Sequence, residues 1–99
     1  MDPNSVLECL KALHREVELD CGEDPDLVTD AVQPLDGLGG FDSPLIPTLV
    51  RQLAKVMMVD LPKGTRLQNP YLSADKTRKL PLREVAARFC VLYGKEVQS

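Results

Sequence analysis

Three stretches of the chain carry apolar residues at intervals of three and four, and this periodicity limits the folds open to it more than any other feature. Such spacing gathers apolar side chains on one face of an α-helix, and no stretch shows the alternation of a half-buried strand. At 99 residues the chain is below the size at which domains divide. The sequence therefore predicts one all-α domain over residues 1–99, a small bundle whose helices bury their apolar faces together.

The first stretch predicts a helix over Ser5–Leu19. Ser5 and Glu8 have the spacing of a capping box, and Gly22 supplies a stop. The expected apolar face consists of Val6, Leu10, Leu13 and Val17. His14 is a single histidine with no partner nearby in sequence, so we expect a surface or rim position rather than a base or metal ligand.

The second and last stretches predict a helix between Pro44 and Met58 and another from about Pro81 to Gly94. Pro44 and Pro47 restrict the backbone before each of them, so the second helix is expected to open with an irregular turn. Its expected apolar face is Ile46, Leu49, Val50, Leu53 and Met57, widened by Leu45 and Val56; that of the last helix is Leu82, Val85, Ala86, Phe89 and Tyr93.

The connection Glu23–Ser43 is long and shows no helical periodicity. Loops of this length are unusual in compact domains and often functional. Its apolar residues, which are Val28, Val32, Leu35 and Leu38, are expected to pin it to the core. A second irregular segment, Thr65–Lys79, offers Tyr71 and Leu72 as an anchor.

Charge is unevenly distributed. Residues 1–43 carry eleven acidic against two basic residues, a net charge of −9, and residues 44–99 carry ten basic against four acidic residues, a net charge of +6. Such asymmetry fits either a partner-selecting surface or two solvated faces that attract each other. The three cysteines suit reduced thiols, and Cys9 and Cys90 are expected in the core. No apolar run or leader indicates a membrane or secretion, so we expect a cytoplasmic protein.

Ser43 lies between Asp42 and Pro44, after a glycine pair. Proline disfavours helical geometry in the residue before it, so Ser43 is expected to be extended and to precede the second helix. One interpretation is a helix cap. The other is a modification point, because no neighbouring side chain could activate the hydroxyl and another enzyme would have to do so.

One long segment, LDGLGGFDSPLIPTLVRQLAKVMMVDLP, resembles the core of the phosphopantetheine carrier family, the acyl and peptidyl carrier proteins. The matching elements are the signature Gly40–Ser43, the apolar helix after it and the closure Val59–Pro62. Ser5–Leu19 and Leu82–Tyr93 would be the family's first and last helices. The resemblance implies an acyl-carrier-like four-helix bundle with a long first loop.

By the same resemblance, Ser43 would bear 4′-phosphopantetheine through a phosphodiester, and Asp42 would help a phosphopantetheinyl transferase hold magnesium and coenzyme A. The arm would carry acyl, aminoacyl or polyketide intermediates as thioesters. A non-catalytic, monomeric carrier would meet acyl-activating enzymes, synthases or acyltransferases through Pro44, Leu45, Arg51 and Lys55. This basic helix differs from the acidic one of fatty-acid carriers, which favours a specialised fatty-acid-like, polyketide or non-ribosomal peptide pathway.

Other functions remain open from the sequence. The chain could be a carrier-like interaction module that is never phosphopantetheinylated. A helix-turn-helix is suggested by the segment LPLREVAARFCVLYG, but no recognition helix follows Gly94 and the net charge is −3, so no nucleic acid is expected. An enzyme is disfavoured because no paired carboxylates with histidine, metal cluster or phosphate-binding glycine loop is present.

Overall fold

The computed structural model describes residues 2–59, 69–73 and 75–93, with the side chain of Ser43 excepted. These residues form four α-helices, which are α1 (Pro3–Asp20), α2 (Pro34–Gly37), α3 (Ile46–Val56) and α4 (Leu82–Tyr93). Two short 3₁₀ turns, η1 (Pro25–Leu27) and η2 (Ser43–Leu45), lie between them. The predicted all-α bundle with a long first loop is confirmed.

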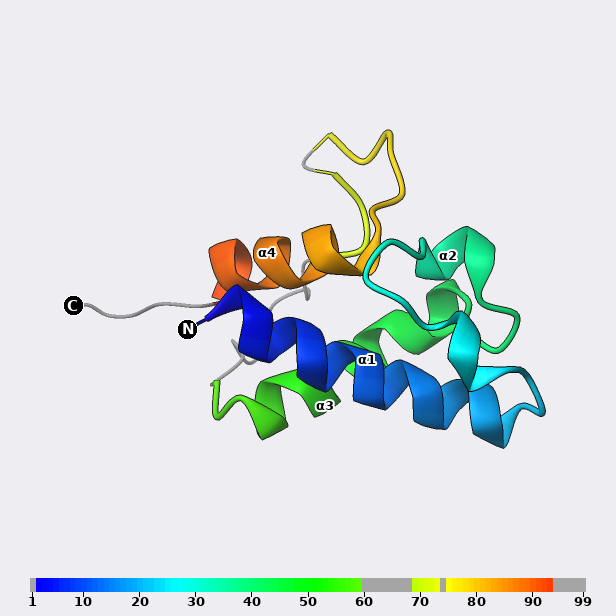
Figure 1. The fold of residues 1–99 in the computed structure, drawn as a ribbon. Coiled ribbons are helices and arrows are strands. Elements are labelled where there is room, and N and C mark those ends of the chain that lie inside the picture. The colour runs from blue at the N-terminus through cyan, green and yellow to red at the C-terminus, as the bar shows by residue number, and fades with distance from the viewer. Residues whose placement is uncertain (1, 60–68, 74, 94–99) are drawn as a thin grey trace.

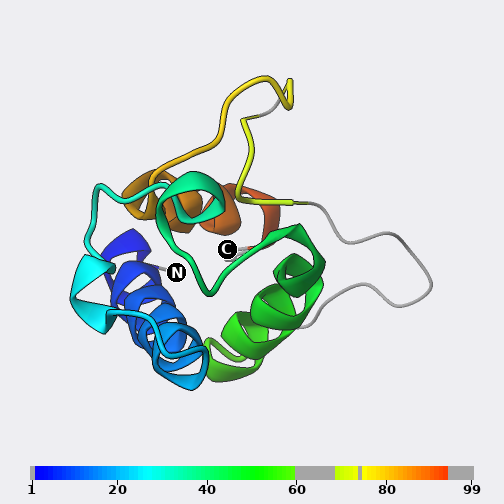
Figure 2. The same cartoon turned by 90° about the vertical axis from the view of Figure 1, so that its right-hand side faces the viewer.

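The three longer helices surround the core. α1 runs antiparallel to α3 and α4, and the chain from α2 to α3 crosses the end of the bundle where α1 ends and α3 begins (Figure 1 and Figure 2). The buried apolar side chains are Val6, Leu7 and Leu10 of α1, Ile46, Leu49, Val50, Leu53 and Ala54 of α3, and Leu82, Val85, Ala86, Phe89 and Tyr93 of α4. Cys9 and Cys90, which were expected in the core, are half-buried and pack against it.

The N-terminal cap of α1 differs from the prediction. Asp2, not Ser5, occupies the cap, and its carboxylate accepts the backbone N–H of Asn4 at 3.2 Å. Ser5 lies inside the helix, where its hydroxyl donates to Asp2 Oδ2 at 3.2 Å. Pro3 explains the earlier start, because its fixed φ is already suited to the first helical position. At the other end Gly22 has a φ of 78°, as a helix-stopping glycine requires.

α3 begins as predicted, after an irregular turn. The backbone N–H of Leu45 donates to Asp42 O at 3.0 Å, closing a 3₁₀ turn before the α-helix starts at Ile46. Of the predicted apolar face, Ile46, Leu49, Val50 and Leu53 are buried. Leu45 and Met57 are half-buried, and Val56 is 55% exposed, so the face is narrower than expected. Of the closure Val59–Pro62, all but Val59 lies outside the described residues.

The long first connection is partly ordered by short helices that periodicity did not predict, η1 and α2. Val28 and Leu38 are buried, and Val32 and Leu35 are half-buried against the core, as expected. α2 is a single turn that begins at Pro34, too short to show a repeating apolar pattern. Apolar anchors, rather than regular structure, therefore hold this connection to the bundle.

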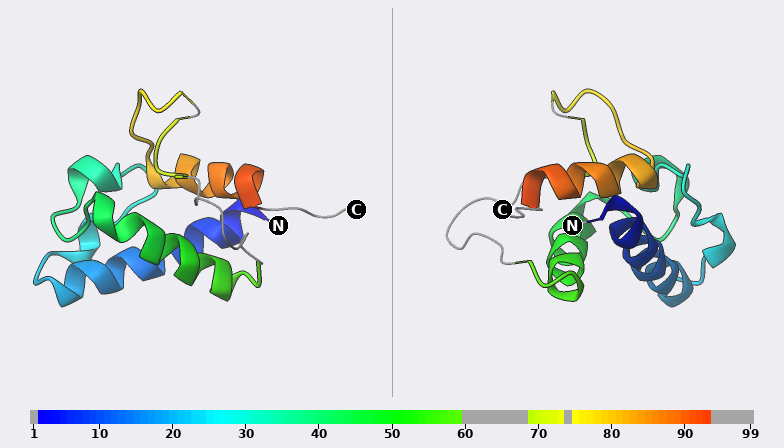
Figure 3. Two further views of the ribbon diagram at one scale, coloured as in Figure 1. Left: turned by 180° about the vertical axis from the view of Figure 1, so that it is seen from behind. Right: turned by 60° about the vertical axis from the view of Figure 1, so that its left-hand side comes forward.

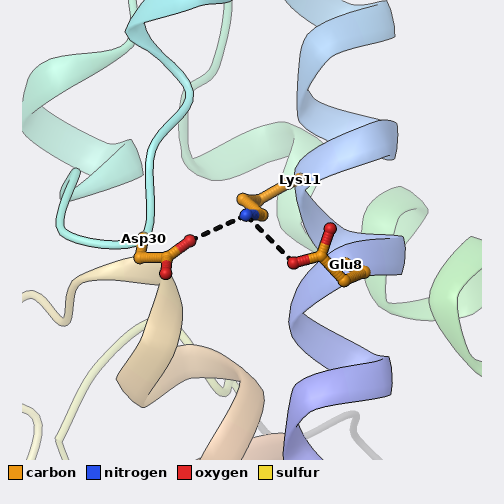
Figure 4. A network of polar contacts seen from close by, with 3 residues as sticks. All are labelled: Glu8, Lys11 and Asp30. Carbon is orange, nitrogen blue, oxygen red and sulfur yellow. Dashed lines mark ion pairs between the residues drawn. The ribbon is translucent and has the colours of Figure 1, made fainter.

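The same connection also accepts hydrogen bonds from the first backbone N–H groups of α4. The backbone N–H groups of Leu82 and Arg83 donate to the carbonyls of Val32 and Asp30, each at 2.9 Å. The Asp30 carboxylate in turn pairs with Lys11 of α1 at 2.8 Å, and Lys11 also contacts Glu8 at 3.0 Å (Figure 4). These contacts tie the connection to α1 and α4 together.

The segment before α4, described over residues 69–73 and 75–81, extends away from α1, α3 and α4 (Figure 3). Its base is held by an isolated antiparallel bridge between Leu72 and Lys79, in which the backbone N–H of Leu80 donates to Tyr71 O at 3.0 Å. Tyr71 is 2% exposed, which confirms it as the predicted anchor.

Replacing Lys11 with methionine should lower the free energy of unfolding at low salt, since Asp30 loses its cation while the aliphatic stem is retained. Hydrogen bonds to Asp30 first, and then to Glu8, raise the Lys11 pKa above its usual 10.5. A raised pKa stabilises the fold below the unfolded-state value, so the effect should be fully present at neutral pH and lost at higher pH. Urea unfolding of the wild type and Lys11→Met in low and high salt measures it.

The difference between the two proteins should shrink in high salt, because salt screens exposed charges. Arg15→Met is the matched control, since Arg15 is an exposed base on the same helix. A difference that stays constant with salt would contradict an ionic role for Lys11.

Candidate functional site

The predicted modification site is reached through a short loop, Gly39–Ser43, which we call the Ser43 loop. It leaves α2 after the buried Leu38 and reaches η2 across the end of the bundle (Figure 2). Phe41 in its middle is 3% exposed, whereas Asp42 is exposed. The loop is therefore anchored in the fold at Phe41 and emerges at Asp42.

Glu18 of α1 holds the first part of the loop. Its side chain is fully buried, and Oε1 accepts the backbone N–H of Gly40 at 3.0 Å. A Cβ atom on Gly40 would lie 2.8 Å from Glu18 Oε2, closer than such atoms approach in proteins. Glycine at position 40 is thus what allows the loop backbone to lie against this carboxylate.

The end of α1 makes two further approaches to the glycine pair. The thiol of Cys21 donates to Gly40 O at 3.7 Å, a weak hydrogen bond. A Cβ on Gly39 would lie 2.8 Å from the Glu23 carboxyl group. Both peptide groups of Gly40 are consequently bound by side chains from one helix end.

Phe41 lies between two aromatic residues from distant parts of the chain. Its ring is 4.6 Å from that of His14 in an edge-to-face arrangement and 4.9 Å from that of Tyr71. His14 Nε2 and the Tyr71 hydroxyl share a hydrogen bond of 2.8 Å. α1, the Ser43 loop and the segment before α4 therefore meet in one buried cluster.

Burial controls the protonation of this cluster. It lowers the pKa of His14 from 6.5 to about 4, so the imidazole is neutral at physiological pH. It also raises the pKa of the Tyr71 phenol well above its usual value, so the hydroxyl stays protonated. The cluster is a neutral hydrogen-bonded support rather than an acid–base pair for chemistry at the surface.

The prediction that His14 lies at the surface or rim is wrong, since it is fully buried. A sequence feature that indicates burial of His14 is its place in an i, i+4 series on one helix face. The members of this series are all buried, and they are Val6, Leu10, His14 and Glu18. Because His14 and Glu18 are polar, the apolar pattern of this series stops at Leu10, and the sequence did not show that the buried face continues. Glu18 was missed for the same reason.

Ser43 opens the turn η2 and does not cap α3. The residue in the cap position of α3 is Leu45, which makes no side-chain cap hydrogen bond. The expectation of an extended Ser43 is wrong, because the hydrogen bond from Leu45 N–H to Asp42 O draws it into a 3₁₀ turn despite Pro44. The predicted position before the helix proper is correct.

The remaining predicted site residues lie around this turn and along α3. Asp42 and Pro44 are exposed, and Leu45 is half-buried against the core. Arg51 and Lys55 are exposed on α3, and neither takes part in the ion pairs between described residues. We use the term α3 outer face for the exposed side chains Thr48, Arg51, Gln52 and Lys55. The turn η2 thus leads directly into a helix whose exposed side is basic.

The described residues contain neither a membrane-spanning helix nor a cluster of metal ligands. No helix among them has the length and apolar character needed to cross a membrane. Within the same residues, no three His, Cys, Asp or Glu side chains are grouped so as to hold a metal ion. Comparison of the chain with protein-family models, with curated proteins and with solved structures found no match.

Proposed function

We propose that the chain is a carrier protein whose Ser43 bears 4′-phosphopantetheine and whose arm holds acyl, aminoacyl or polyketide intermediates as thioesters. The observation that carries the proposal is the form of the Ser43 loop. Its inner part is bound by Glu18 and Phe41 is buried, while Asp42 and Pro44 on either side of Ser43 are exposed. A modifying enzyme needs a loop that is firmly held and whose residues around the target are open to contact, as Asp42 and Pro44 are.

The loading step is a phosphoryl transfer performed by a partner enzyme. The Ser43 hydroxyl would attack the β-phosphorus of coenzyme A, forming a phosphodiester and breaking the pyrophosphate bond, so that adenosine 3′,5′-bisphosphate leaves. The hydroxyl proton would pass to a base of the transferase. The exposed carboxylate of Asp42 is suited to the magnesium ion that accompanies the coenzyme A phosphates.

The α3 outer face supports a proposal about the partners. Its charged side chains are basic, whereas the first 43 residues carry a net charge of −9. Partner enzymes with acidic docking surfaces would be attracted to α3, and steering of this kind weakens as salt rises. We infer a specialised fatty-acid-like, polyketide or non-ribosomal peptide pathway in which the chain itself is not catalytic.

Incubation with coenzyme A, magnesium and a broad-specificity phosphopantetheinyl transferase should add the mass of one phosphopantetheine to the wild type and none to Ser43→Ala. Intact-mass spectrometry measures it. Ser5→Ala, which removes an exposed hydroxyl elsewhere, should be modified like the wild type. The absence of any gain in folded wild-type protein, beside a known carrier that is modified, would contradict the proposal. It would favour an interaction module without the arm.

A further inference from the structure

A buried carboxylate close to the proposed attachment point has no part in the loading chemistry. Glu18 is fully buried, and carboxylates are seldom buried unless they are paired or hydrogen-bonded. The structure gives it one hydrogen bond, from Gly40 N–H, and Oε2 has no partner among the described residues. The principal polar contact of the buried Glu18 carboxylate is therefore with the Ser43 loop.

The geometry of that contact is restrictive. One carboxylate oxygen binds the amide of Gly40, and the other lies against its Cα, where a Cβ would come within 2.8 Å. The carbonyl of the same residue accepts from Cys21. Gly40 is thus fixed at both peptide groups, and three residues of chain reach at most about 11 Å. Any shift at Gly40 is transmitted over a short distance to the backbone of Ser43.

We propose that Glu18 is a positioning residue, which holds the Ser43 loop through Gly40 in the geometry that a phosphopantetheinyl transferase accepts. The inference rests on the proposed function and adds to it a residue on α1 that the transferase does not touch. The contact with Gly40 requires an oxygen acceptor at the end of a side chain of this length. It does not require a negative charge.

Three substitutions separate these requirements. Glu18→Gln keeps the length and an oxygen acceptor but loses the charge. Glu18→Asp keeps the charge but withdraws the acceptor by one methylene, and Glu18→Met keeps the volume without an oxygen acceptor. Val6→Ala is the matched control, because it removes buried volume from the same helix about 18 Å away.

The first readout is hydrogen exchange of the Gly40 amide, followed by NMR below the unfolding transition. The amide should exchange at the wild-type rate in Glu18→Gln and Val6→Ala, and at least tenfold faster in Glu18→Met and Glu18→Asp. Unchanged exchange in folded Glu18→Met would overturn the inference. If Glu18→Met does not fold, Glu18→Asp supplies the same comparison.

The second readout is the kinetics of phosphopantetheinylation. Loss of positioning should lower kcat/KM of the transferase about tenfold for Glu18→Met and Glu18→Asp. Glu18→Gln should restore it, and Val6→Ala should stay near the wild type as long as it is folded. Equal loss in Val6→Ala would mean that Glu18 acts through overall stability, which overturns the positioning role.

The two proposals fail in different ways. An unmodified wild type contradicts the carrier function, whatever the exchange data show. If the wild type is modified but the Gly40 amide exchanges at the wild-type rate in Glu18→Met and Glu18→Asp, only the role of Glu18 is contradicted.

Discussion

Replacing Phe41 with alanine is expected to lower the free energy of unfolding by about 3–5 kcal/mol and to release the Ser43 loop. The ring is 3% exposed and packs against His14 and Tyr71, so its removal leaves a cavity where three segments meet. Small domains are stable by about 5–15 kcal/mol, so the variant should remain folded but lose much of its margin. Urea unfolding followed by far-UV circular dichroism gives the stability.

Phe89→Ala is the matched control for this prediction. Phe89 is fully buried on α4, and its ring lies 5.2 Å from that of Tyr93 in a tilted arrangement. Its removal should cost a similar free energy but leave the exchange of the Gly40 amide unchanged, whereas Phe41→Ala should accelerate it. Equal protection of Gly40 in both variants would contradict the view that Phe41 anchors the loop.

Acidification is the second change with a large expected effect. The pKa of His14 is 6.5 in the unfolded chain and about 4 in the fold, so the unfolded chain binds the additional proton between these values. The contribution of His14 is therefore full above pH 6.5 and lost progressively as the pH falls to 4. A shift of this size corresponds to about 3 kcal/mol. Urea midpoints measured across this range test the prediction.

The cause of the low pKa of His14 is burial, which disfavours the charged imidazolium. The Tyr71 hydroxyl and the Phe41 ring face the imidazole, and Glu18 lies one turn further along α1. His14→Gln cannot titrate, so its stability should depend less steeply on pH between 6.5 and 4, by at most about 1.4 kcal/mol per pH unit. An unchanged slope in His14→Gln would show that another group is responsible.

The helices were predictable because periodicity is a local property of the chain. Leu82, Val85, Ala86, Phe89 and Tyr93 were expected on one face of the last helix, and all are buried. Their spacing alone specifies that face, whatever they pack against. The helical stop at Gly22 follows from the same kind of local rule.

The errors at His14 and Glu18 concern groups whose environment is made by distant residues. His14 is buried because Phe41 and Tyr71 close over it, and neither is near it in sequence. Glu18 is buried because a glycine of the returning loop offers an amide. The error at Ser43 is local, because the hydrogen bond from Leu45 N–H to Asp42 O outweighs the bias imposed by Pro44.

The sequence alone determined the all-α class, the order of the long helices and the irregular entry into α3, since each depends on residues within a few positions of one another. The tertiary structure decided which side chains hold the Ser43 loop. Hydrogen bonding and burial act between atoms close in space. Glu18 meets Gly40, and His14 meets Phe41, only when the loop crosses the end of the bundle.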